Sequence, residues 1–291
     1  MLDEKGKEPE GKNLNISDAL FYGLIQGVTE FIPVSSAAHL SILFNLFGVP
    51  ATGFNVKAFS VFLHFGTIIA ALISYLQDFG EVFFQTLEFA ASGPGSGGPR
   101  RKNFPSARLL FMMVFSSLPL LMIMPLNTYI NRLFDHSALA GIMLILTGVM
   151  LFVSDRMMDG TKNERNMSLS DAIIIGLCQM VSSIPGISRT GTVYTAGIAV
   201  GLKREFAAKY AVMLSVPVMF LANIVRLVDA AGDGFAWADL PPCLVGMAAA
   251  VAAGMLSIRI LKALASSGRF RTVGYYCCVA GVLSVILTMI F

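Results

Sequence analysis

Charged residues are scarce in this chain. Asp, Glu, Lys and Arg together account for 13% of 291 residues, whereas hydrophobic residues account for 55%. Soluble domains carry a charge at roughly 25% of their positions, and the mean hydropathy of this sequence is +0.72. The composition therefore excludes an ordinary soluble domain and indicates an integral membrane protein.

Three further features are missing. The first fifteen residues contain no apolar run and no small-residue cleavage site, so we expect no signal peptide. The basic residues do not gather on one soluble face, so nucleic acid is not expected as a partner. No metal-type CxxC spacing occurs, and the cysteines lie in or beside apolar segments, so we expect them to be packing residues. These are Cys178, Cys243, Cys277 and Cys278.

Long apolar runs are abundant. Six segments reach the roughly 17 to 25 residues that a helix needs to cross a bilayer, which predicts an all-α integral membrane protein with about six transmembrane helices. Prolines in the second and fourth segments predict kinks. The segments are 55–76, 108–130, 137–154, 206–229, 238–261 and 271–291.

The net charge is only +3, but the basic residues are unevenly distributed. Most lie in connections that six crossings place on one side, and an excess of Lys and Arg marks the cytoplasmic side of a membrane. These residues are Arg100, Arg101, Lys102, Arg108, Arg156, Lys162, Arg165, Lys203, Arg204, Lys209, Arg259, Lys262, Arg269 and Arg271.

One pattern occurs twice: DALFYGLIQGVTEFIPVSS at 18–36 returns as DAIIIGLCQMVSSIPGIS at 171–188. The loop charges place the two starts on opposite faces, which predicts an inverted-topology repeat within one polytopic membrane domain. Repeat one covers about 17–130 and repeat two about 169–261. Each copy is too short and too polar for a simple span, so we predict two re-entrant helix pairs broken at the prolines. The Gly- and Ser-rich stretch 92–99 is predicted to be a flexible cytoplasmic linker.

The two helix breaks bring polar residues into an apolar chain. Ser35 or Ser36 is placed to cap one returning helix and Ser188 the other, and such helix starts favour an anion. Arg189, with Gly186 before it and Thr190 after it, suits a phosphate. We therefore predict that Ser35, Ser188, Arg189, Thr190 and Gly186 bind the substrate.

Gln26 and Glu30 stand one helical turn apart and offer the oxygen ligands that Mg²⁺ or Ca²⁺ prefers. His39 lies three residues after Ser36, so the two share a helix face. Plainer roles stay open at this point: Glu30 as the structural partner of Arg189, the serines as helix caps, and His39 as an interior histidine. His64 is left as a site neighbour and His136 as a surface residue.

These motifs carry a resemblance. GVTEFIPVSSAAH at 27–39 and PGISRTG at 185–191 resemble the two signatures of the undecaprenyl-diphosphate phosphatase family, the bacitracin-resistance type. The resemblance covers most of the chain. It implies a multi-pass enzyme of the bacterial inner membrane, surrounded by membrane lipids, that hydrolyses undecaprenyl diphosphate. The product is the lipid carrier for peptidoglycan synthesis, and the activity gives bacitracin resistance.

The resemblance also implies roles for single residues. It implies a divalent cation at Gln26 and Glu30, a nucleophile and acid/base pair at Ser36 and His39, and phosphate binding at Ser188 and Arg189. Glu30, Ser36, His39 and Arg189 are therefore the predicted catalytic residues. The chain departs from the family in two places. Gln26 stands where many members have Glu, and Val193 stands where Thr often occurs, with Thr192 or Thr195 as substitutes.

Three routes for the attack on phosphorus remain open: Ser36 with His39 as base, His39 itself, or a metal-bound water. The competing function is a carrier that moves a lipid phosphate or a small anion, because inverted repeats also build transporters. A serine beside a histidine favours chemistry over transport. The sequence does not set the oligomeric state, so a homo-oligomer stays open.

Overall fold

The computed structural model describes residues 15–47, 56–91, 105–126, 129–130, 133, 137–232 and 237–290. Within these ranges the chain is helical, and its extended structure amounts to one isolated bridge between Lys162 and Leu202. The predicted all-α class is confirmed. The predicted linker at 92–99, His136 and the charged first residues fall outside the described ranges.

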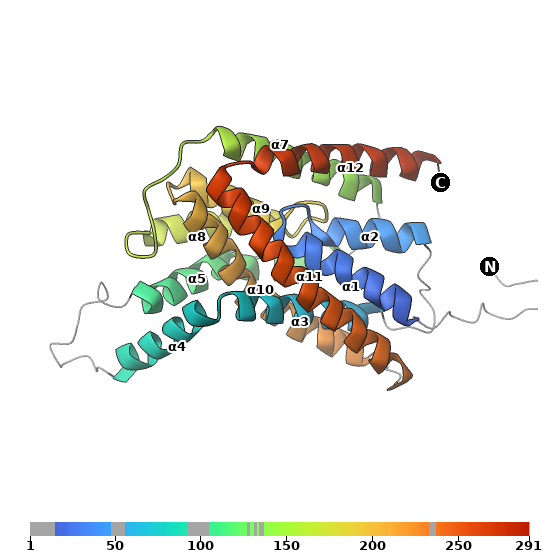
Figure 1. Ribbon diagram of the computed structural model, residues 1–291, viewed down its shortest axis with the longest axis horizontal. Helices are drawn as coiled ribbons and strands as arrows, with labels where there is room; N and C mark the ends of the chain where they lie inside the picture. The colour runs from blue at the N-terminus through green and yellow to red at the C-terminus, as the bar shows by residue number, and fades with distance from the viewer. Residues whose placement is uncertain are drawn as a thin grey trace, which may run out of the picture.

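In chain order the helices are α1 (Ile16–Phe31), α2 (Ser36–Phe47), α3 (Val56–Ser74), α4 (Leu76–Ala91), α5 (Pro105–Leu121), η2 (Met124–Leu126), α7 (Ser137–Arg156), α8 (Leu169–Val181), α9 (Arg189–Ala199), α10 (Arg204–Gly232), η3 (Trp237–Asp239), α11 (Leu240–Ser267) and α12 (Phe270–Ile290). Helices α7, α12, α2 and α3 lie roughly along the long axis of the molecule, and α11 crosses it obliquely (Figure 1).

Five helices are long and apolar enough to cross a membrane: α3, α7, α10, α11 with η3, and α12. They match five of the six predicted segments. The sixth segment, 108–130, for which the prolines predicted a kink, is not among these five: α5 ends at Leu121 after 17 residues, and the short η2 follows. Pro119 already removes one helical hydrogen bond near the end of α5, and Pro125 lies just beyond it. Helix α4 has no counterpart among the predicted segments.

Both predicted helix breaks are present. Helix α1 ends at Phe31 and α2 begins at Ser36, while α8 ends at Val181 and α9 begins at Arg189. In Figure 1 the pair α1–α2 lies toward the right end of the bundle, whereas α8 lies toward the left end.

Helix α1 packs closely along α11 through small residues. A Cβ atom on Gly23 or Gly27 would come within 3 Å of the α11 backbone. Ser257 of α11 also donates a hydrogen bond of 2.8 Å to the carbonyl oxygen of Gly27. Small residues at such crossings let helix backbones approach closely, which is how helices associate in lipid.

The second copy repeats this packing against a different helix. Gly176 of α8 is the counterpart of Gly23 in the repeat, and it faces the backbone of Ser116 in α5. Ser116 donates a hydrogen bond of 2.7 Å to the carbonyl oxygen of Ala172. The matching faces of α1 and α8 thus hold the two helix pairs in place.

A substitution at Gly27 tests this packing. Gly27→Leu should lower the thermal stability of the protein in detergent by several degrees, because overpacking costs about 1–3 kcal/mol and the backbone of α11 is the obstacle. Gly80→Leu on α4 is the matched control, since a Cβ there meets no atom within 4 Å. Equal melting temperatures for the two variants would contradict the packing argument.

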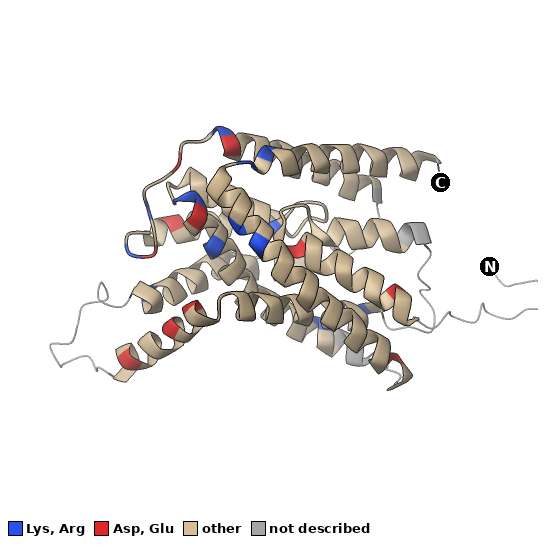
Figure 2. Cartoon of the chain, viewed as in Figure 1, with Lys and Arg blue, Asp and Glu red and all other residues tan. Residues whose placement is uncertain are grey.

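Basic residues at one end of the bundle tie the connections together (Figure 2). Lys162 bonds both carboxylate oxygens of Asp171, at 2.8 and 2.9 Å, where Asp171 forms a capping box with Ser168. Burial disfavours the charged carboxylate, but the hydrogen bonds from Lys162 and Ser168 outweigh it and hold the pKa of Asp171 below its usual value. Helix α8 therefore starts at a well-anchored point.

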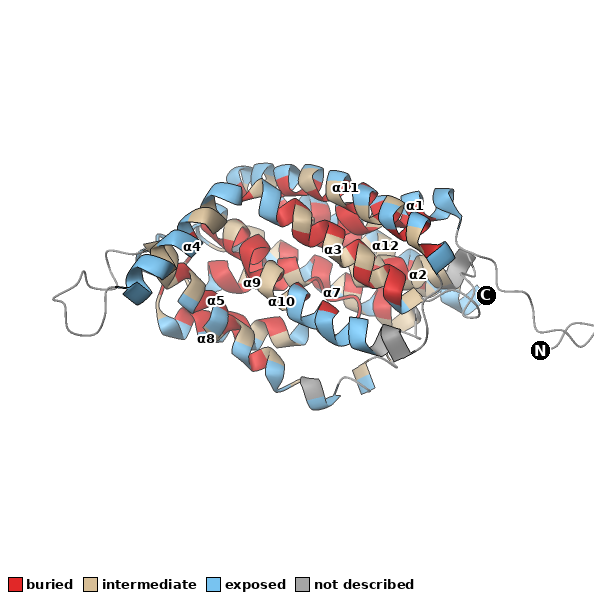
Figure 3. Ribbon diagram, turned by 90° about the horizontal axis from the view of Figure 1, so that it is seen from below, coloured by how far each residue is buried: buried red, intermediate tan, exposed pale blue. Residues whose placement is uncertain are grey.

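Buried residues concentrate where α9 and the first half of α10 meet their neighbours (Figure 3). Tyr194 of α9 and Tyr210 of α10 have no exposed surface. Tyr194 packs on Phe270 of α12, with ring centroids 4.1 Å apart. Helix α9 is thus embedded in the core, and its first turn, which begins at Arg189, has a fixed position.

Candidate active site

The turn between α1 and α2 contains an unusual backbone conformation. Ser35 has a φ angle of +64°, in the left-handed region that residues other than glycine rarely adopt. Its hydroxyl accepts a hydrogen bond from the backbone N–H of Ala38 at 3.4 Å. Ser35 is therefore the residue that caps α2. The side chain of Ser36 is left available for another partner, which answers the question the sequence left open between these two serines.

The turn between α8 and α9 is held by α7. Gly186 has a φ angle of +102°, and a Cβ there would collide with Ala140 and Met143 of α7. Thr147 donates a hydrogen bond of 2.9 Å to the carbonyl oxygen of Gly186 and accepts one of 3.1 Å from the N–H of Ser188. These contacts explain why glycine occupies position 186, while its predicted role in substrate binding stays a prediction.

Ser188 caps α9, since its hydroxyl accepts a hydrogen bond of 3.1 Å from the backbone N–H of Gly191. Arg189 is the first residue of this helix. The structure therefore confirms that Ser188 is a helix cap. A capped helix start still presents free N–H groups to an anion.

The two turns meet at the carboxylate of Glu30, whose side chain is 4% exposed. Arg189 donates from Nη2 to Oε1 of Glu30. Gln26 Nε2 and Ser36 Oγ donate to Oε2 at 2.8 and 2.6 Å. Thr190 donates to the backbone oxygen of Glu30 at 2.9 Å. The structure thus brings Gln26, Glu30 and Ser36 of the first copy together with Arg189 and Thr190 of the second.

Two polar atoms in this cluster are buried without a hydrogen-bond partner: Oε1 of Gln26 and Nε of Arg189. A buried polar group left unpaired costs about 1–3 kcal/mol, so such groups are suited to binding a ligand. The free oxygen of Gln26 suits a cation, and the free donor of Arg189 suits a phosphate oxygen.

Gln26 and Glu30 alone provide only part of the ligand set that a divalent cation needs. In the described portion of the chain, no three His, Cys, Asp or Glu side chains gather as a metal site. Gln26 and Glu30 offer oxygen ligands, and Mg²⁺ is commonly bound by one or two carboxylates together with substrate phosphates and water. The pair therefore fits a metal whose remaining ligands come from a phosphorylated substrate.

His39 points away from Ser36. Its Nδ1–H donates to the backbone oxygen of Ser35 at 2.9 Å, so Nε2 accepts from the Tyr276 hydroxyl at 2.7 Å. The two rings are stacked with centroids 5.7 Å apart. Among the described contacts there is no hydrogen bond between His39 and Ser36. They share a face of α2 as predicted, but each side chain follows a different neighbouring helix.

Arg226 is a site neighbour that the sequence reasoning missed. It is accessible to solvent, yet the charges of both Arg189 and Glu30 act on it. The same two charges act on His64, so the prediction of His64 as a neighbour is supported. Asn223 stands one turn before Arg226, is 1% exposed, and leaves its Nδ2 unpartnered. The available signal was Arg226 itself, the one charged residue between Tyr210 and Val228 of the apolar run, because a charge inside a membrane span marks function by default.

The threonines after the second motif differ from each other. Thr192 donates its hydroxyl to the backbone oxygen of Ser188 at 2.8 Å, so that hydroxyl is already engaged. The Thr195 hydroxyl is buried without a partner. Val193 is 1% exposed and packs in the core. Of the two predicted substitutes, Thr195 is the one with a free hydroxyl.

Comparison with known proteins agrees with these motifs. A family model described as "Bacitracin resistance protein BacA" matches residues 19–283. A protein of Methanosphaera stadtmanae named undecaprenyl-diphosphatase is 30% identical over 281 residues, covering 95% of this chain and 99% of its own length. Proteins of the same name from Halothermothrix orenii and Methanobrevibacter smithii are 31% and 33% identical. They cover 96% and 93% of this chain, and 100% and 96% of their own lengths.

Proposed function

Because the chain belongs to the bacitracin resistance protein BacA family, we propose that it is an undecaprenyl-diphosphatase. It hydrolyses undecaprenyl diphosphate to undecaprenyl phosphate and inorganic phosphate. This reaction recycles the lipid carrier for cell-wall synthesis and gives resistance to bacitracin. The chain is a multi-pass membrane protein, and we place it in the inner membrane with the two helix pairs as inverted, re-entrant repeats.

One observation carries the proposal at the level of residues. The Glu30–Arg189 pair joins the two copies, and beside it lie an unpartnered acceptor on Gln26 and an unpartnered donor on Arg189. If the ion pair were purely structural, the unpaired atoms Gln26 Oε1 and Arg189 Nε would only destabilise the fold. A diphosphate with its cation supplies both.

Arg189 and the first N–H groups of α9 bind the terminal phosphate in this proposal. Phosphoryl transfer depends mainly on positioning and on neutralising charge that spreads over the phosphate oxygens. The guanidinium offers a fork of donors that matches a phosphate. Arg189 exchanges part of its contact with Glu30 for the substrate, which its 23% exposed side chain permits.

Ser36 is the proposed nucleophile and Glu30 its base. Ser36 Oγ already donates to Glu30 Oε2 at 2.6 Å, so the proton passes to this carboxylate as the Oγ–P bond forms. The bond from the terminal phosphorus to the bridging oxygen breaks, and undecaprenyl phosphate leaves. Glu30 gives its proton to the leaving oxygen of undecaprenyl phosphate and is again a carboxylate. Water then attacks the phosphoserine, its proton passes to Glu30, and Glu30 returns a proton to Ser36 Oγ as the Oγ–P bond breaks and inorganic phosphate leaves.

A divalent cation, Mg²⁺ or Ca²⁺, would be held by Gln26 Oε1 and Glu30 together with substrate oxygens. When bound, it supplies positive charge to the diphosphate. His39 takes a positioning role here, because its two ring nitrogens are engaged by Ser35 and Tyr276.

Phosphate release from undecaprenyl diphosphate by the purified protein in detergent tests the function. We expect release that requires a divalent cation and stops with chelator, with Mg²⁺ and Ca²⁺ compared at equal concentration. Absence of release from wild-type protein with a cooperative thermal transition would contradict the phosphatase assignment. Release that persists unchanged in chelator would contradict the proposed metal requirement and leave the phosphatase assignment standing.

Arg226 provides a separate test of substrate binding. Arg226→Gln should raise KM for undecaprenyl diphosphate about tenfold with little change in kcat, because the residue adds charge near the site without contacting Glu30. Steady-state phosphate release at varied substrate concentration measures this. Arg259→Gln on α11 is the control for losing an exposed cation. A fall in kcat at constant KM would contradict a role in binding.

A further inference from the structure

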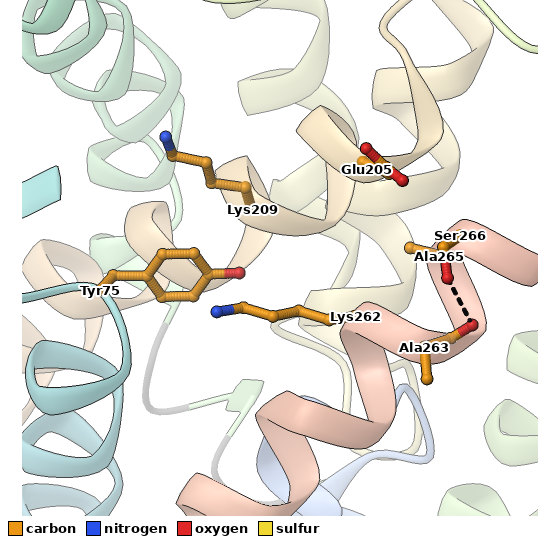
Figure 4. A pocket seen from close by; sticks show the side chains of 7 residues that line it. All are labelled: Tyr75, Glu205, Lys209, Lys262, Ala263, Ala265 and Ser266. Atoms are coloured by element: carbon orange, nitrogen blue, oxygen red, sulfur yellow. Dashed lines mark hydrogen bonds between the residues drawn. The ribbon is translucent and has the colours of Figure 1, made fainter.

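A pocket with charged residues in its lining lies away from the Glu30 cluster, where the ends of three apolar helices converge (Figure 4). Its volume is about 430 Å³. It is lined by Tyr75, Glu205, Lys209, Lys262, Ala263, Ala265 and Ser266. None of these residues takes part in the contacts of Glu30 and Arg189 described above.

The pocket contains a cation without a carboxylate partner. Lys262 Nζ lies 4.1 Å from the ring centroid of Tyr75, which is 5% exposed. No Asp or Glu within the described residues forms an ion pair with Lys262, whereas Lys209 pairs with Asp78 of α4. The Lys262 ammonium is therefore held in place by an aromatic face while its charge remains available.

The residues that line the pocket lie near the ends of three membrane spans. Tyr75 directly follows the span Val56–Ser74, Lys209 lies five residues inside the span that starts at Arg204, and Lys262 lies five residues before the span that ends at Ser267. At 1.5 Å per residue, both lysines are within about 8 Å of the ends of their spans. This is the boundary between hydrocarbon and lipid headgroups.

We propose that this pocket binds the headgroup of an anionic phospholipid such as phosphatidylglycerol. Basic pockets between transmembrane helices at the headgroup level are typical sites for anionic lipids. Lys262 lies on the Tyr75 side and binds the lipid phosphate, while Lys209, which pairs with Asp78, adds positive charge on the same side (Figure 4). Glu205 and Ser266 lie on the other side of the pocket (Figure 4). In this proposal the Glu205 carboxylate accepts hydrogen bonds from the hydroxyls of the glycerol headgroup.

The choice of a lipid over a soluble anion rests on the position of the pocket. A phosphate group at the end of three apolar spans comes with acyl chains that lie along the exposed helix faces. Leu72 and Ile73 at the end of α3, and Ile260 and Leu256, which follow each other into the span along α11, are exposed apolar residues. A free phosphate ion makes no use of such a surface.

Native mass spectrometry of the purified protein, released from mixed phosphatidylglycerol and phosphatidylcholine micelles, tests the proposal. Wild type should retain phosphatidylglycerol in preference to phosphatidylcholine. Lys262→Gln should weaken this retention about fivefold, as expected for one lysine at a lipid surface. Lys262→Arg, which keeps the charge, should retain the lipid. Arg259→Gln, also on α11 but outside the pocket, should behave as wild type.

Two results would overturn the proposal. One is equal retention of phosphatidylglycerol by Lys262→Gln and wild type, each with an unchanged melting temperature in phosphatidylcholine. The other is competition by inorganic phosphate alone, at equal potency to the lipid, which would assign the pocket to a soluble anion. If Lys262→Gln does not fold, loss of retention in Lys209→Gln but not in Arg259→Gln supports the site, and retention in both contradicts it.

Discussion

Glu30→Gln and Arg189→Gln should each lower kcat/KM for phosphate release from undecaprenyl diphosphate by about 10³-fold. Glu30→Gln removes the proposed general base, and general acid–base catalysis contributes about 10²–10⁴-fold, whereas a catalytic arginine in phosphoryl transfer contributes about 10³–10⁵-fold. Each single variant should also be less stable by about 2–3 kcal/mol, because it leaves one charge of a largely buried pair without its partner.

The double variant Glu30→Gln/Arg189→Gln separates structure from catalysis. It removes both charges, so most of the lost stability should return while activity stays at the level of the single variants. Thermal unfolding in detergent and phosphate release measure the two effects on the same samples. Near wild-type activity in the double variant would mean that the pair is only structural.

A second ion pair serves as the control. Lys162 and Asp171 form an ion pair of 2.8 Å at the start of α8, away from Glu30. Their double neutralisation, Lys162→Gln/Asp171→Asn, should keep activity within a few-fold of wild type. A loss as large as that at Glu30 would show that any change to charge near the helix pairs stops the enzyme.

Ser36→Ala should reduce kcat by at least about 10³-fold without unfolding the protein. The hydroxyl is the proposed nucleophile, whereas the cap of α2 comes from Ser35 and is untouched by the change. Ser41→Ala on the same helix is the control for loss of a serine hydroxyl. Phosphate release, together with mass spectrometry of acid-quenched wild type for phosphoserine at position 36, measures the outcome.

His39→Ala should reduce activity much less than Ser36→Ala does. Because His39 makes its hydrogen bonds with Ser35 and Tyr276 and none with Ser36, we expect its loss to cost about tenfold or less. A larger effect at His39 than at Ser36 would reverse the proposed roles. A fall of only about tenfold in Ser36→Ala would favour attack by water, with Ser36 holding Glu30 in position.

The sequence by itself determined the membrane class, the two helix breaks and the residue types at the site. These follow from local rules, since apolar run length predicts spans, proline interrupts a helix, and Gln26 and Glu30 are one turn apart whatever surrounds them. The duplicated pattern further indicated that residues 163 positions apart, such as Gln26 and Arg189, belong to one site. Local sequence rules and the comparison of the two copies were enough for these predictions.

Tertiary structure alone decided which atoms face each other. Ser35 caps α2 because its backbone adopts a φ of +64°, and this choice leaves Ser36 for Glu30. His39 meets Tyr276 because α7 packs against both α2 and α12 and brings them near each other, and Arg226 is influenced by the charges of Arg189 and Glu30 because α10 packs against α9. Helical spacing restricts a side chain to one face of its own helix. The partner it meets there is set by the packing of distant helices, and no local pattern in the sequence encodes that packing.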